Sequence, residues 1–281
     1  MSVPARLSSY FGRVVALTVI CLSIGLTIDP AKAADPVGDT ERVVNNVTGA
    51  GTVGKRKLAV KDPVYRNDTI NAAAASHGEL LLRDGSHVIV GEKSTVSLDD
   101  FVVSGSSFSS GTVKVTKGAF RFISGNSGKE AISIETPRAS IGIRGTLVDV
   151  YVDPVTGVTR TILISGEITA CTKGRIRKCE TIRRSCDILE IDGDEIKQLP
   201  FLHSSAWTAE EEARLFGLTG NQQNFLPEWR AFEGGCFARA AEEARSKRPP
   251  DQGAGNVIPP YIPPQTPPVT PPFDECDGPC G

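Results

Sequence analysis

The chain has 281 residues, of which 40% are hydrophobic and 23% charged, and its formal net charge at pH 7 is −2. This balance provides no global basic field of the kind that nucleic acid attracts. We therefore expect no nucleic-acid partner, and shifts in composition divide the chain into the segments described below.

The first residues have the pattern of a secretory signal peptide. Arg6 and Arg13 precede an apolar run over residues 14–26, and Ala31-Lys32-Ala33 has the small-x-small form that signal peptidase cleaves. The run is shorter than the roughly 18 to 20 apolar residues that cross a bilayer as a helix. We expect residues 1–33 to be removed between Ala33 and Ala34, which predicts a periplasmic or secreted protein with no stable membrane span. The alternative is an uncleaved anchor, and with it a membrane-anchored signal-transduction regulator.

The next two segments differ in apolar content. Residues 34–57 are rich in Gly and Asn, so we expect a flexible N-terminal arm or a late-ordering first strand. Residues 58–171 carry short apolar runs with no helical periodicity between them. Asp84-Gly85 joins two of these runs and is a strong hairpin signal.

Alternation of apolar and polar residues continues along the second segment. It extends over 94–103 and 113–123 with the period of a half-buried strand, and Gly118 indicates a bulge or bend. A turn at 153–157 joins two further runs. The pattern predicts a mainly β fold, in which antiparallel sheets pack as a sandwich or coil as a roll.

A further hairpin, turning at 192–194, is expected in the extension 172–204. It carries a basic run: Lys173, Arg175, Arg177, Lys178, Arg183 and Arg184. Alternation with apolar or polar residues is typical of the solvated face of a hairpin. The sharper hypothesis is a contact surface for an anionic envelope polymer or for an acidic patch of a partner protein.

The cysteines predict disulfides. Outside the expected signal peptide their number is even, which favours disulfides in an oxidising compartment. Cys276 and Cys280 flank a turn-forming sequence and can bridge each other. The remaining four, Cys171, Cys179, Cys186 and Cys236, allow three pairings, and we expect those at 171, 179 and 186 to staple the hairpin extension to the main sheet. Their spacing is not that of a metal site, so we expect no metal and no cofactor.

Helix and proline-rich sequence follow. In the small helical segment 205–248, Thr208 and Glu211 form a capping box, and a second helix is expected over 235–247 with an apolar stripe of Phe237, Ala240, Ala241 and Ala244. The aromatic residues Trp207, Phe216, Trp229 and Phe232 are interpreted as packing residues. Residues 249–281 predict a disordered polyproline II tail with a terminal Cys pair, which is either a spacer or a recognition motif.

No catalytic motif is complete. Residues 125–130 resemble a phosphate-binding loop, but Ile123 stands where the motif requires glycine and Glu130 where it requires Ser or Thr, so we interpret them as a hairpin loop. Asp192, Asp194 and Glu195 lack the full calcium-loop pattern. We therefore expect a protein that is not an enzyme.

Three stretches resemble the FecR domain of bacteria. These are 68–85 with Asp68-Thr69-Ile70 and Gly78-Glu79-Leu80, the strand Gly118-Ala119-Phe120-Arg121-Phe122, and Glu135-Thr136-Pro137 to Arg144-Gly145-Thr146. The resemblance implies an extracytoplasmic β module over residues 58–171, with Pro137 at a strand boundary and with Gly142 and Gly145 permitting bends or a close backbone approach. Arg144 is then either a rim residue paired with Glu135 or Asp149, or a contact for an anionic partner.

The resemblance favours binding or sensing. Well-known members join this module to a cytoplasmic sigma-factor-binding domain through a membrane helix, an arrangement not expected here. We expect an exported non-enzymatic module of the cell envelope that contacts a protein, for which sheet-edge pairing is one mode. The alternative is attachment to cell-wall glycan. The candidate contact residues are Arg144, Lys173, Arg175, Arg177, Lys178, Arg183 and Arg184.

Overall fold

The computed structural model describes residues 35–128, 130–220, 222, 225–227, 230 and 234–247. Several predictions concern residues outside these ranges and stay predictions: the signal peptide with its cleavage between Ala33 and Ala34, the Pro-rich tail with Cys276 and Cys280, and the packing of Trp229 and Phe232.

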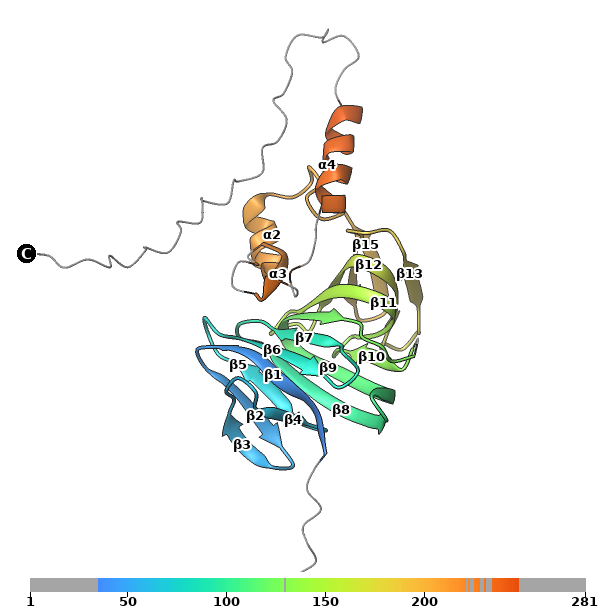
Figure 1. Cartoon of the computed structure of the whole chain (residues 1–281). Coiled ribbons are helices and arrows are strands. Elements are labelled where there is room, and N and C mark those ends of the chain that lie inside the picture. Colours follow the sequence, from blue (N-terminus) through green and yellow to red (C-terminus); the bar gives the residue numbers. More distant parts are fainter. Residues whose placement is uncertain are drawn as a thin grey trace, which may run out of the picture.

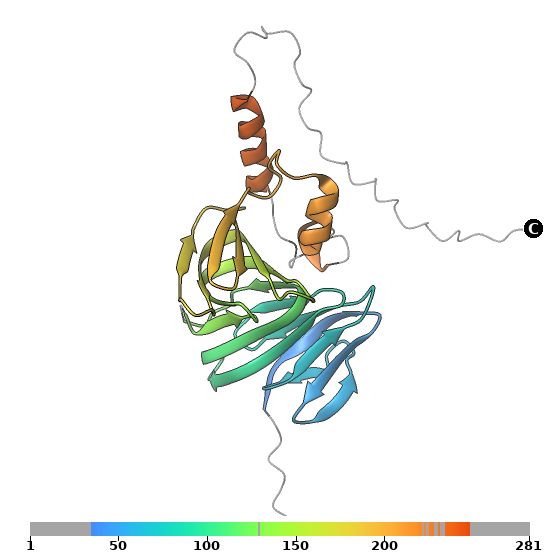
Figure 2. The same ribbon diagram turned by 180° about the vertical axis from the view of Figure 1, so that it is seen from behind.

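The described chain is mainly β, as predicted, and its strands form one mixed sheet (Figures 1 and 2). The strands are β1 (Pro36–Val44), β2 (Val47–Gly51), β3 (Gly54–Lys57), β4 (Pro63–Tyr65), β5 (Thr69–Ala72), β6 (His77–Leu82), β7 (His87–Val90), β8 (Thr95–Ser104), β9 (Ser107–Ile123), β10 (Ile132–Glu135), β11 (Ala139–Val152), β12 (Thr159–Thr172), β13 (Cys179–Ile182), β14 (Ile188–Asp192) and β15 (Glu195–Leu199). The helices are α2 (Ala209–Leu215), α3 (Gly217–Gly220) and α4 (Gly234–Ser246). Both views place the helices together at one side of the sheet.

The main path through the sheet is β15-β14-β12-β11-β10-β9-β7-β6-β1-β4, and β8, β5, β2 and β3 branch from it. The sheet has two parts, β1 to β8 and β10 to β15, and β9 joins them. The first half of β9 pairs with β8, and its second half pairs with β7 and β11. The change of partners occurs at Gly118, where φ is +86° and a Cβ atom would overlap Ser94. The predicted bend at this glycine is therefore confirmed.

The β11–β12 hairpin coils the second part of the sheet, β10 to β15, into a roll. Its register shifts between Arg144 and Leu147, and there Gly145 has φ +57° while Gly166 on the partner strand has φ +90°. A side chain on Gly166 would overlap the carbonyl oxygen of Gly145, so the corner requires glycine. The hairpin curls until Thr136, just before it, lies 2.7 Å from Thr159, hydroxyl to hydroxyl. The predicted roll is thus confirmed, and Gly145 marks its corner.

Two predictions for the sheet were wrong. Of the two alternatives for the N-terminal segment, the flexible arm is wrong: residues 36–57 form β1 to β3, because Val37 and Val47 are buried in the core and β1 pairs with both β4 and β6. Residues 124–131 are not a hairpin loop. The predicted hairpin at 125–130 does not form, because β9 before these residues and β10 after them pair in parallel.

The coiled sheet encloses the main hydrophobic core. Two smaller clusters of buried residues attach the helical unit to the sheet. Ile162, Ile188 and Phe216 belong to one, and Ile89, Leu218 and Phe225 to the other. Beneath the second cluster, Arg121 is fully buried and donates two hydrogen bonds to Asp149, at 2.6 and 2.7 Å. Its third bond, at 2.6 Å, reaches the side-chain oxygen of Gln222. The Arg121–Asp149 ion pair is thus buried between β9 and β11, and the hydrogen bond from Arg121 to Gln222 connects it to the segment that follows α3.

The helices agree only partly with prediction. The capping box of Thr208 and Glu211 begins α2 as expected. α4 was expected to bury an apolar stripe, but Phe237, Ala241 and Ala244 are exposed, and Cys236 is the buried residue. The disulfide at Cys236 decides which face of α4 turns inward. Within the described residues, no helix is long and apolar enough to span a bilayer.

Candidate partner-binding site

Two disulfides choose among the three possible pairings. Cys171 and Cys179 lie directly opposite each other on β12 and β13 and are bonded, which closes the loop between these strands. Cys186 is bonded to Cys236 and fixes α4 beside β14. The expectation that Cys186 staples the hairpin to the main sheet was therefore wrong, because its partner lies on a helix.

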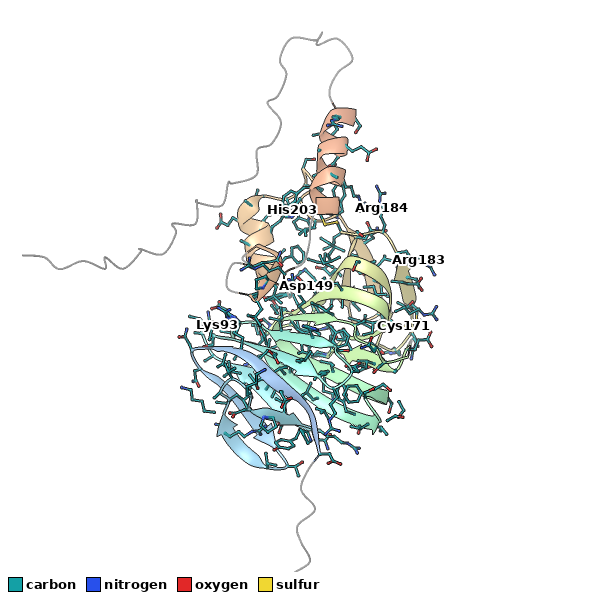
Figure 3. All side chains as sticks on the ribbon, in the orientation of Figure 1. Lys93, Asp149, Cys171, Arg183, Arg184 and His203 are labelled. Carbon is teal, nitrogen blue, oxygen red and sulfur yellow. A yellow bond between two sulfur atoms is a disulfide. The ribbon has the colours of Figure 1, made fainter. Side chains whose placement is uncertain are left out.

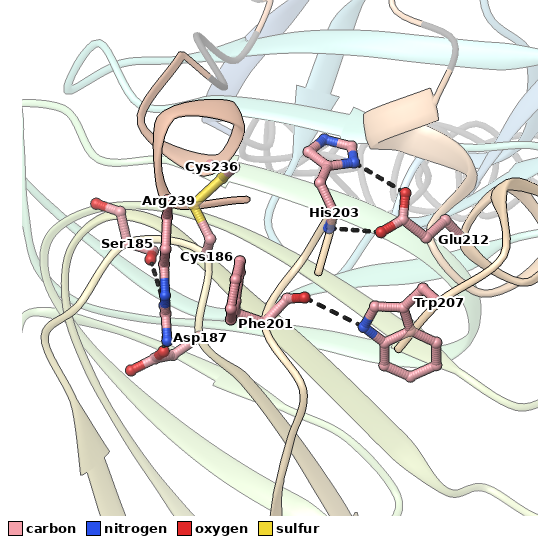
Figure 4. The surroundings of a disulfide bond; sticks show 9 residues. All are labelled: Ser185, Cys186, Asp187, Phe201, His203, Trp207, Glu212, Cys236 and Arg239. Atoms are coloured by element: carbon pink, nitrogen blue, oxygen red, sulfur yellow. Dashed lines mark hydrogen bonds and ion pairs between the residues drawn. A yellow bond between two sulfur atoms is a disulfide. The ribbon is translucent and has the colours of Figure 1, made fainter. Parts of the chain in front are cut away.

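Figure 4 shows how the second disulfide is surrounded. Arg239 donates to the Ser185 carbonyl oxygen at 3.1 Å and to the Asp187 carboxylate at 2.6 Å, and its guanidinium lies 3.9 Å above the Phe201 ring. Trp207 donates its indole N–H to the Phe201 carbonyl at 3.2 Å. These contacts confirm Trp207 as a packing residue. The Arg239 guanidinium and the Trp207 indole N–H are hydrogen-bonded within the protein, so we assign this side of the molecule a structural role.

Three of the seven predicted contact residues have carboxylate partners. Lys173 pairs with Glu135 and donates to the Thr136 carbonyl at 2.8 Å, and Arg183 lies 2.6 Å from Glu167. Arg144 pairs with Glu130 and, at 3.7 Å, with Glu167.

The partners expected for Arg144 were wrong. Asp149 is held by Arg121 inside the protein, and Glu135 by Lys173. The hydrogen bond and charge of Glu130 raise the pKa of the exposed Arg144 guanidinium. Arg144 is a rim residue, and its charge is largely balanced by carboxylates.

The other four cations are exposed and unbalanced. Within the described part of the chain, no carboxylate pairs with Arg175, Arg177, Lys178 or Arg184. Ile176, whose side chain is 60% exposed, stands between Arg175 and Arg177. Figure 3 places Arg183 and Arg184 on the side of the molecule that carries β13. We call residues 172–178, closed by the Cys171–Cys179 disulfide, the basic loop.

Arg138 fixes the basic loop in place. Its Nε donates to the Thr156 carbonyl at 2.9 Å, its Nη1 lies 3.0 Å from Asp192, and its carbonyl accepts from the Lys173 N–H at 3.0 Å. Three turns and the basic loop are thus joined at one end of the roll. Arg138 was not among the predicted site residues, although its position directly after Pro137 at a strand boundary is a signal for it.

The same contacts account for the acidic turn. Asp192 faces Arg138, Asp194 accepts from the Ile176 N–H at 3.2 Å, and Glu195 pairs with Lys197 at 3.1 Å. Among the described residues no group of three or more His, Cys, Asp or Glu could hold a metal ion. The carboxylates of this turn support the loop.

A polar hollow of about 370 Å³ adjoins the basic loop. Its walls include Arg144, Arg177, Glu167, Ser133, Ser140 and Thr169. Gly142 leaves its floor open, because a Cβ atom there would meet only the Thr169 carbonyl, at 3.9 Å. A second hollow, of about 310 Å³, lies on the other side of Arg144 and is lined by Asp84, Ser86 and Ser127 among others. Both hollows are open; the first is mainly polar, and the second also has Phe122, Ile132 and Ile143 in its lining.

Comparison with known proteins confirms the resemblance. Residues 68–169 match the model of the family described as "FecR protein", so this segment is a FecR-like domain. Two crystal structures of a "putative anti-sigma factor" from Parabacteroides distasonis ATCC 8503, at 2.50 and 1.65 Å resolution, are similar to the chain at 12% and 13% identity, with TM-scores of 0.38 and 0.39. Each alignment covers 47% of this chain and 59% of the crystallised one. No curated protein matches.

Proposed function

We propose that this protein is a non-enzymatic binding or sensory module of the bacterial cell envelope, and that the basic loop contacts an acidic protein segment. The observation that carries the proposal is the set of exposed cations on and beside the loop, Arg175, Arg177, Lys178 and Arg184, for which no carboxylate partner lies within the described residues, together with the exposed Ile176 between Arg175 and Arg177. A loop fixed by a disulfide and by Arg138 loses little conformational entropy on binding, which favours affinity.

The neighbouring strand gives the mode of contact. Among the described strands β13 pairs with β12 alone, so its outer edge presents backbone N–H and C=O groups to which no described strand is paired. An extended segment can add to such an edge through main-chain hydrogen bonds. Acidic side chains on that segment would then meet the basic loop, which supplies charge complementarity and orientation. Two disulfides fit an oxidising compartment.

The test is in-cell crosslinking of the tagged whole chain, followed by mass spectrometry of captured proteins. We compare wild type with Arg175→Glu/Arg177→Glu and with the control Arg83→Glu/Arg245→Glu, which makes the same charge change at two exposed arginines, one in the β6–β7 turn and one on α4. The proposal expects one dominant envelope protein, reduced about tenfold or more by the loop variant and retained by the control. Equal capture by all three proteins would overturn it.

A further inference from the structure

One face of the region formed by β3, β2, β5, β8 and β9 is polar from edge to edge. Ile70 and Val96 point into the core, so the residues next to them along each strand face outward. The strand register aligns the outward residues in a row that crosses all five strands: Lys57, Thr48, Asn71, Thr95 and Lys117. Hydroxyl and amide groups thus occupy the middle of the row, and a lysine stands at each end.

A second row repeats this arrangement two or three residues along each strand. It consists of Lys55, Ala50, Thr69, Ser97 and Lys114. Of its lysines, Lys114 is paired with Asp99 at 3.1 Å. Strands lie about 4.8 Å apart, so the two lysines of a row are attached to backbones separated by about 19 Å. This span exceeds the size of a single oxyanion.

A hollow of about 330 Å³ opens on the first row. It is lined by Asn46, Thr48, Asn71, Lys93, Thr95 and Lys117, with Ala72, Ala73 and Ser94 as the remaining wall, and so contains neither a carboxylate nor an aromatic ring. The Thr95 hydroxyl donates to Asn71 Oδ1 at 2.9 Å, which leaves the Asn71 amide N–H groups to donate outward.

The walls of the hollow are fixed by backbone contacts. The Lys93 N–H donates to the Ala73 carbonyl at 3.1 Å, and Lys93 has φ +55°, which is uncommon for a residue with a side chain. The neighbouring Glu92 carboxylate accepts from the Ala75 N–H at 2.9 Å. Donor groups therefore dominate the hollow: two ammonium groups, the Asn amides and the Thr hydroxyls.

We propose that this face binds an acidic saccharide, a chain of sugar units that carry carboxylates. The lysines would form charge-assisted hydrogen bonds with the carboxylates, and the Asn71 and Thr48 side chains would bond to sugar hydroxyls. An isolated oxyanion would use only the lysines and would leave the hydroxyl and amide row without a role. The site is separate from the basic loop, because Lys93 and Cys171, which closes that loop, lie on opposite sides of the molecule (Figure 3).

The test uses the whole chain and three defined probes in titration calorimetry: trigalacturonate, neutral maltotriose and inorganic tripolyphosphate. Asn71→Asp keeps an oxygen acceptor for the Thr95 hydroxyl but adds a negative charge, and Lys117→Gln removes an exposed charge without affecting the core. Arg175→Gln/Arg177→Gln is the control on the basic loop. We expect trigalacturonate to bind, about tenfold more weakly to either single variant and equally to the control, and maltotriose to bind more weakly.

Two kinds of result would overturn this inference. One is absence of trigalacturonate binding, or binding that neither single variant weakens. The other is tripolyphosphate binding as tight as trigalacturonate binding, which would indicate a simple oxyanion site. Neither result bears on the protein contact of the basic loop, whose variants and readout are different.

Discussion

Arg121 shows what a single buried charge demands. Its guanidinium is fully buried and its bidentate partner Asp149 is 8% exposed. We expect Asp149→Asn to lower the free energy of unfolding by about 3–5 kcal/mol, because it leaves a buried charge uncompensated. Asp99→Asn makes the same change in an exposed pair with Lys114 and should cost less than about 1 kcal/mol. Urea unfolding measures both, and equal losses would refute the structural role of the buried pair.

Gly166 is a second residue on which the fold depends. Its φ of +90° and its approach to the Gly145 carbonyl leave no room for a Cβ atom. Gly166→Ala should therefore destabilise the protein by at least about 2 kcal/mol. Gly128→Ala is the control, since a Cβ atom there meets nothing within 4 Å. Similar melting temperatures for the two variants would contradict the corner that we assign to Gly166.

At the scale of elements, α4 is attached to the sheet by one covalent bond and a few polar contacts. We expect Cys236→Ser to lower the free energy of unfolding by about 2–4 kcal/mol. Amide hydrogen exchange should rise over 234–247, while β9 and β11 stay protected. The Cys171→Ser/Cys179→Ser variant should instead affect the basic loop. Uniform exchange throughout the Cys236→Ser variant would show that the disulfide supports the whole sheet.

The β11–β12 turn should respond to acid. Hydrogen bonds from the Thr156 and Val155 N–H groups lower the pKa of Asp153 below its usual value. A depressed pKa in the folded state stabilises the protein above the unfolded pKa, near about 3.9, and this contribution is lost as the pH falls through the folded pKa. The difference in unfolding free energy between wild type and Asp153→Asn should therefore be constant above about pH 5 and shrink as the pH falls below that value. If the difference in unfolding free energy did not change with pH, the hydrogen bonds to Asp153 would not lower its pKa as we infer.

For the whole molecule, sequence predicted local structure better than long-range pairing. The Asp84-Gly85 hairpin, the Gly145 bend and the Thr208 capping box depend on adjacent residues, and all three are confirmed. The parallel β9–β10 pairing and the Cys186–Cys236 bond join residues distant in sequence, and no local pattern specifies them.

The candidate site was also predictable in its local features but not in its long-range contacts. The basic run was visible in the sequence, but which cations stay free depends on carboxylates brought close by folding. Glu135 and Glu167 neutralise Lys173 and Arg183, and they lie on other strands. Arg138, which joins the turns that support the basic loop, was missed because its partners come from three separate segments.

The central claim is that the basic loop contacts an acidic protein segment. The most direct measurement places a photocrosslinking amino acid at Ile176, 60% exposed on the loop, and at Val53, 46% exposed in the β2–β3 turn, in separate whole-chain proteins in cells. The account predicts a single envelope-protein adduct from position 176, on an acidic peptide, and none from position 53. The same adducts from both positions, or none from position 176, would contradict it.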